Sequence, residues 1–101
     1  MDETLSVELY RKDERNTLQT GSLSVYPNGA VRIDGWDFGE LPKQVWGHDD
    51  YEFEVTVPGT EIRKLVFALL RDRYLGRMGA VGELREFCEK EGIETNFFAW
   101  P

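Results

Sequence analysis

The stretch Ser22-Leu-Ser-Val-Tyr-Pro-Asn-Gly-Ala-Val-Arg-Ile33 decides the fold, because it contains two strands and the turn that joins them. Apolar and polar residues alternate before the turn and again after it, which is the period of a half-buried β-strand. Pro27 fixes its own φ angle, and Asn28-Gly29 tolerate the left-handed backbone conformation that reverses a chain. The sequence therefore predicts a β-hairpin. Its inward-facing residues are Leu23, Val25, Val31 and Ile33.

Two further segments on either side of this hairpin also alternate. Leu5–Tyr10 has apolar residues at every second position, and Lys12–Thr17 reads as a polar connector between it and the hairpin. Tyr51–Val57 alternates again, with acidic residues between the apolar ones. Four such segments in succession predict an antiparallel meander.

The period changes from two to helical spacing after Pro58. Thr60 is a suitable N-cap for a first helix that ends near Tyr74. A glycine-containing break follows, and then a second helix that Gly92 terminates. The last segment, Ile93–Trp100, is either a fifth short strand or an extended tail across the core.

Strands followed by helices predict an α+β fold, with an antiparallel four- to five-stranded sheet (a meander) and two C-terminal helices packed on one face. The 101 residues are enough for a single domain, 1–101. Cys88, the only cysteine, cannot form an internal disulfide, and its place on the apolar side of the second helix favours inert packing. Because we find no signal sequence and no apolar stretch of about 20 residues, we expect a soluble cytoplasmic protein.

The net charge of −7 is unevenly distributed along the chain. Residues 34–54 hold seven acidic residues and one basic residue, whereas residues 55–79 hold two acidic and five basic ones. An acidic surface disfavours nucleic acid and anionic membranes and favours a basic protein partner. The basic stretch 63–77 is a local exception, and it could meet the acidic segment of a second copy in a weak homodimer; otherwise we expect a monomer.

The acidic segment 34–54 also contains five aromatic residues and the longest connection of the chain, about Gly35–Asp50. Within that connection Leu41–Trp46 is predicted to form one helical turn, because Pro42 suits a first helical position. If Trp36 and Trp46 are exposed, they are the anchors expected of a protein interface; the alternative is that both close over the core. The predicted partner-binding residues are Trp36, Asp37, Glu40, Trp46, Asp49, Asp50, Glu52 and Glu54.

Few residues suggest catalysis or metal binding. Asp50, Glu52 and Glu54 share one face of a strand, which is typical of a solvated face and matches no metal-binding loop. His48 is the only histidine and lies in a predicted surface turn. We expect no cofactor, no metal and no catalytic residues.

The leading hypothesis is a non-enzymatic protein-binding module that docks a basic partner through residues 36–54. In size, acidity and single-domain layout the chain is similar to bacterial immunity proteins that neutralise toxins, a similarity that matches no motif and implies no residue assignments. Two alternatives are open. One is a small-ligand-binding protein or enzyme with a pocket between sheet and helices, using Arg32, Tyr10 or Tyr26. The other is a structural subunit of a larger assembly.

Overall fold

The computed structural model describes residues 3–47 and 50–101. Backbone contacts group the chain into two units, residues 1–65 and 66–101. The elements in chain order are β1 (Leu5–Glu14), β2 (Thr17–Val25), β3 (Val31–Gly39), α1 (Glu40–Trp46), β4 (Asp50–Val57), the 3₁₀ turn η1 (Gly59–Glu61), α2 (Ile62–Tyr74) and α3 (Ala80–Glu91).

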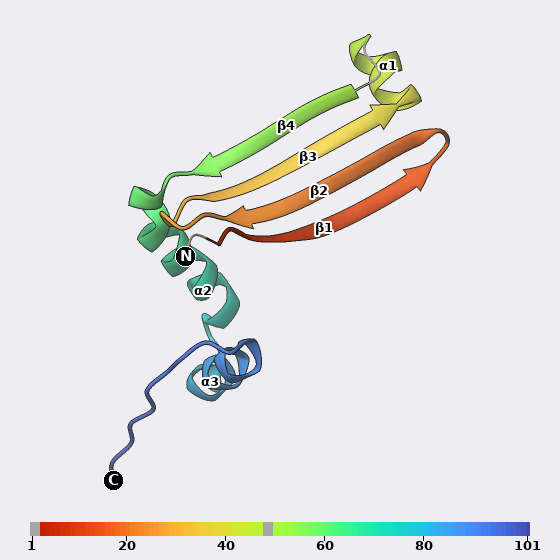
Figure 1. Ribbon diagram of the computed structural model, residues 1–101. Helices are drawn as coiled ribbons and strands as arrows, with labels where there is room; N and C mark the ends of the chain where they lie inside the picture. Colours follow the sequence, from red (N-terminus) through yellow and green to blue (C-terminus); the bar gives the residue numbers. More distant parts are fainter. Residues whose placement is uncertain (1–2, 48–49) are drawn as a thin grey trace. The chain divides into compact units, whose positions relative to one another are not determined.

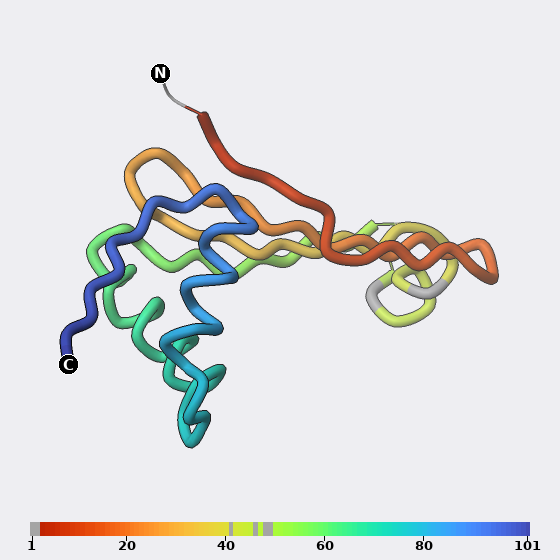
Figure 2. The backbone as a smooth tube through the Cα atoms, turned by 90° about the horizontal axis from the view of Figure 1, so that it is seen from below, coloured from red at the N-terminus to blue at the C-terminus, as the bar shows by residue number. Residues whose placement is uncertain are grey.

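The four strands form one antiparallel sheet in the order β1-β2-β3-β4 (Figure 1). Seen from its edge, the sheet is a single layer (Figure 2). The α+β class and the meander are therefore confirmed. Residues 93–101 form no strand, so the sheet of the described chain has four members. That the C-terminal helices pack on one face of the sheet, and that 1–101 is one domain, stay predictions.

The β2–β3 hairpin forms where the sequence predicts it. The Gly29 N–H donates to the Tyr26 carbonyl at 2.8 Å, and Gly29 has a φ of 88°. Asn28 contributes differently from what we expected: its side-chain Oδ1 accepts a 2.9 Å hydrogen bond from the Ala30 N–H. Only the glycine of the pair is left-handed, and the asparagine holds the turn with its side chain.

The predicted polar connector between β1 and β2 is wrong. β1 continues to Glu14 and β2 begins at Thr17, so only Arg15 and Asn16 form the turn. Their φ angles are 53° and 58°, which is the left-handed pair of a type I′ hairpin turn. Polar residues are tolerated in β1 because its side chains are exposed along the whole strand.

The predicted long irregular connection at Gly35–Asp50 is also wrong. β3 continues to Gly39, which is paired with Thr17, and α1 follows at once. The helical turn is confirmed, with Pro42 fully buried. Gly39 makes the change of direction possible, because its φ of 121° is accessible almost only to glycine.

Residues paired across the strands share a face, so the register defines two faces. The aliphatic face carries two complete rows of Leu, Val and Ile, and then the rings of Tyr10 and Phe53, which lie over Gly21 and Gly35. The opposite face, called the acidic face below, carries acidic residues on β3 and β4, among them Asp34, Glu52 and Glu54. Members of the two aliphatic rows are Leu5, Val7, Leu23, Val25, Val31, Ile33, Val55 and Val57.

The unit 66–101 contains most of α2, all of α3 and the C-terminal segment. Gly92 ends α3 in the left-handed conformation, as predicted. Cys88 is 8% exposed and is the buried apolar side chain of α3. At the start of α2 the predicted cap is wrong, because Thr60 lies inside η1 and no side chain caps that turn.

Candidate functional site

The acidic face has its aromatic side chains on β3, and three of its six carboxylates on β4. Trp36 is paired with Glu52, and Phe38 with Asp50. The Trp36 and Phe38 rings contact each other, with centroids 5.4 Å apart and planes 37° apart. Trp36 is half-buried, so part of its ring is accessible beside the acids.

The structure brings together four of the predicted partner-binding residues. Trp36, Asp50, Glu52 and Glu54 lie on the acidic face, whereas Asp37 is paired with Tyr51 on the opposite face. Glu40 lies in the first turn of α1. The side chain of Trp46, together with His48 and Asp49, lies outside the part of the chain that the structure describes.

Sequence reasoning missed several members of this face. Asp34 and Phe38 belong to it, as does Leu18, which is paired with Phe38 on β2. The signal was the alternation Asp34-x-Trp36-x-Phe38, which is strand periodicity inside a segment that we expected to be a loop. The full set of charged residues on this face is Glu8, Asp13, Asp34, Asp50, Glu52 and Glu54, with Arg11 and Arg32.

Two of these carboxylates face each other directly. Asp34 is paired with Glu54, so their Cβ atoms are about 5 Å apart and the like charges repel. Arg32 offsets this only in part: its Nε lies 3.5 Å from Asp34 Oδ2, in ion-pair range but without hydrogen-bond geometry. Thr56 donates to Glu54 Oε2 at 3.4 Å. The acidic face therefore keeps uncompensated negative charge.

An open groove of about 630 Å³ lies along β3 and β4 among these residues. Trp36 is one of its lining residues, and the Nε1–H of this side chain is buried and has no hydrogen-bond partner among the described residues. Buried indole N–H groups usually have a partner, so this donor is an unsatisfied group that an acceptor reaches only if the surrounding side chains move. The charged residues that line the groove are Arg32, Asp34, Glu52 and Glu54.

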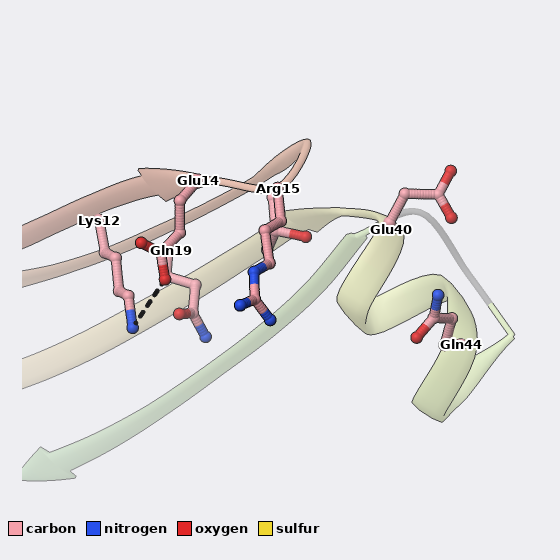
Figure 3. Close-up of a pocket in the computed structure, with 7 residues that line it drawn as sticks. Lys12, Glu14, Arg15, Gln19, Glu40 and Gln44 are labelled. Atoms are coloured by element: carbon pink, nitrogen blue, oxygen red, sulfur yellow. Dashed lines mark ion pairs between the residues drawn. The ribbon is translucent and has the colours of Figure 1, made fainter.

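A second, smaller cleft of about 360 Å³ lies where the β1–β2 turn approaches α1 (Figure 3). It is lined by charges of both signs. Lys12 and Glu14, two positions apart on β1, are paired at 3.2 Å. The other charged residues that line it are Arg15, in the turn, and Glu40, in the first turn of α1.

Of the three residues proposed for a pocket between sheet and helices, Arg32 and Tyr26 lie together and Tyr10 lies apart from them on the opposite face. Arg32 lies over the Tyr26 ring, 5.5 Å from its centroid, whereas Tyr10 covers Gly21 on the aliphatic face. Across residues 3–47 and 50–101, no three His, Cys, Asp or Glu side chains come together as a group that could hold a metal ion.

Several basic residues of α2 and the following turn form ion pairs with acidic residues close to them in the sequence. Lys64 pairs with Glu61 at 3.5 Å, and Arg71 with Asp72 at 3.5 Å. Arg77 makes two hydrogen bonds to Glu83, of 2.9 and 3.0 Å. These pairs are on the surface, and the Lys64 side chain stays 82% exposed, so they offset only part of the positive charge of the stretch.

Comparisons with known protein families, curated proteins and solved structures find no match to this chain. Within the residues that the structure describes, no helix has the length and apolar character needed to cross a membrane.

Proposed function

We propose that this protein is a non-enzymatic binding module that docks a basic protein surface through its acidic face. One observation carries the proposal: Trp36, with an unpartnered indole N–H, lies in an open groove between uncompensated carboxylates. The carboxylates attract a basic partner over long range, and the accessible part of the indole ring supplies short-range contact.

The test compares wild-type protein with two variants as baits for host proteins, quantified by mass spectrometry. We expect basic partners to be lost from Trp36→Ala and from the double variant Glu52→Lys/Glu54→Lys. The control is Glu86→Lys/Glu89→Lys on α3, which changes the net charge equally and should keep the partners. For a purified partner, Trp36→Ala should weaken binding at least tenfold, as for a hot-spot residue. Retention of the same partners by both acidic-face variants would refute the proposal.

A narrower form of this proposal is an immunity-type role, in which the basic partner is a toxin. The acidic face, with its groove and its exposed ring, is the kind of surface that could cover a basic active-site rim. Co-expression with a toxin encoded nearby should restore growth with wild-type protein and fail with Trp36→Ala. Rescue by Trp36→Ala at equal expression would exclude this face as the neutralising surface.

The small cleft beside α1 supports a second candidate function, the binding of a small zwitterion. Arg15 and Glu40 line the same cleft and could bind a carboxylate and an ammonium group. Equilibrium dialysis with free amino acids tests this. Binding that is lost in Arg15→Gln and Glu40→Gln would support it, and the absence of binding would remove it.

A further inference from the structure

The sheet has two outer strands, β1 and β4, and each pairs on one side only within the described chain. An outer strand presents unpaired N–H and C=O groups to any extended segment that approaches it. The two edges of this sheet differ in how well they are protected.

The β1 edge is interrupted. Its register shifts between Glu8 and Tyr10, which is a β-bulge, and bulges disrupt further pairing. Beyond the bulge β1 carries charges of both signs, with Arg11 bound to Glu8 and Lys12 to Glu14. Because its charges are mixed, the β1 edge does not favour an incoming strand of either charge.

The β4 edge is regular. Its register with β3 runs without a shift from Val57, paired with Val31, to Asp50, paired with Phe38. Its sequence, DYEFEVTV, contains no proline and no lysine, the residues that most often block edges. The side chains sort by face, because Glu52 and Glu54 lie on the acidic face and Phe53 and Val55 on the aliphatic face. Phe53 and Val55 are 43% and 69% exposed.

A second copy of this chain fits the β4 edge poorly. Two β4 strands paired antiparallel with Phe53 opposite Phe53 would place Glu52 of each copy opposite Glu54 of the other. Like charges directly opposite on adjacent strands are destabilising. The charge pattern therefore selects a strand that carries positive side chains at every second position.

We propose that β4 accepts a fifth strand from the basic partner: an extended segment in which cationic and apolar residues alternate. The inference rests on the proposed function and specifies how the partner binds. The cations would lie beside Glu52 and Glu54, the apolar residues beside Phe53 and Val55, and backbone hydrogen bonds would continue the sheet. In this mode of recognition the backbone supplies affinity and the alternate side chains supply specificity.

The first test uses two capped octapeptides of identical composition, titrated calorimetrically into the full-length protein. In one, lysine and valine alternate; in the other, a block of lysines precedes a block of valines. We expect the alternating lysine–valine peptide to bind at least tenfold more tightly. A third peptide is the alternating one with N-methyl groups on its four central backbone nitrogens, which keeps the charge and removes the backbone donors. It should lose at least tenfold in affinity.

The second test exchanges the charges. Glu52→Lys/Glu54→Lys should weaken binding of the alternating lysine–valine peptide at least about fivefold, the loss of two cross-strand charge pairs. The same variant should create binding of an alternating glutamate–valine peptide. The control variant, Glu86→Lys/Glu89→Lys, should bind the lysine–valine peptide as the wild type does.

Three results would overturn strand addition: no binding of the alternating peptide, equal binding of both orders, or full affinity of the methylated peptide. A dimer of the chain alone that Glu54→Lys strengthens would assign the edge to a second copy, and would also reject strand addition by a basic partner. Failure of strand addition is separable from failure of the proposed function, because docking of a purified partner by the acidic face alone would still depend on Trp36.

Discussion

Single glycines determine where rings and backbone come close in this sheet. A Cβ atom at Gly35 would lie 2.5 Å from the Phe53 ring, and one at Gly39 would overlap the Asn16 carbonyl oxygen. Gly39 has the further constraint of its φ of 121°. The glycines therefore bring β3 against its neighbours and connect it to α1, and thus position the carboxylates of β4 beside Trp36.

Replacement of Gly39 by alanine should be strongly destabilising. Backbone strain at such a φ costs about 1–3 kcal/mol, and the Asn16 carbonyl must also move. Gly47→Ala is the matched control, because Gly47 has a φ of 81° but no atom within 4 Å of the added carbon. In urea unfolding, Gly39→Ala should lose more free energy of unfolding than Gly47→Ala. Equal losses would show that the Asn16 contact does not matter.

The Arg77–Glu83 pair connects the turn before α3 to the first turns of that helix. The hydrogen bond from Arg77, opposed by some desolvation, lowers the pKa of Glu83 below its ordinary value of 4.5, and the same pair raises the pKa of Arg77. A lowered carboxyl pKa means that the stabilisation is complete above pH 4.5 and is lost as the pH falls through the folded-state pKa.

Arg77→Met should therefore raise the pKa of Glu83 towards 4.5 in an NMR titration of the carboxyl carbon. In parallel, the wild type should lose its stability advantage over Glu83→Gln when unfolding is measured at successively lower pH below 4.5. Glu86→Gln, a control on the same helix, should show no such convergence. A Glu83 pKa that Arg77→Met leaves unchanged would contradict the assignment.

Among the strands and turns, those determined by their own residues were predictable from the sequence, and those imposed by strand pairing were not. The β2–β3 hairpin was predictable because Pro27 and Gly29 are unambiguous turn residues. The Arg15–Asn16 turn was not, because an arginine with a φ of 53° has no sequence signature and is imposed by the pairing of β1 with β2. The strand character of 34–39 was hidden by its glycines and acids.

The candidate site was predicted only in part, because some of its residues are placed by alternation along one strand and others by the register between strands. Glu52 and Glu54 alternate with apolar residues, so their common face could be read from the sequence. Asp34 lies on that face only because β3 pairs with β4 in the observed register, and Asp37 is excluded from it by the same register. A shift of one residue would exchange their faces.

The repulsion between Asp34 and Glu54 predicts a stabilising substitution. Glu54→Gln keeps the oxygen that accepts from Thr56 and removes the like charge, so the free energy of unfolding should rise by about 0.5 kcal/mol. The gain should shrink in about 1 M salt, which screens the repulsion. Glu89→Gln on α3 is the control for net charge. A loss of stability in Glu54→Gln would show that Arg32 already neutralises the pair.

In the whole molecule, the two units differ in net charge. Residues 1–65 carry 13 acidic and seven basic residues, whereas residues 66–101 carry six and five. The long-range attraction that we propose for a basic partner would therefore originate mainly from the sheet unit. The same charge keeps molecules with exposed apolar side chains apart in solution.

Solubility should therefore depend steeply on pH. At the sequence pI of about 4.7 the net charge vanishes and association through apolar surface is no longer opposed. Light scattering should show a minimum of solubility near that pH and monodisperse protein at about pH 7. Variants with fewer negative charges, such as Glu52→Lys/Glu54→Lys, should move the solubility minimum to higher pH. A solubility curve that is flat across this range would contradict the prediction.

The Tyr10 ring occupies the space above Gly21 where any other residue would carry a side chain. The Gly21 α-proton on that side is therefore held against an aromatic π-system and experiences its ring current. Its shielded resonance is a label-free reporter of the paired β1–β2 ladder and should shift when the bulged outer strand detaches.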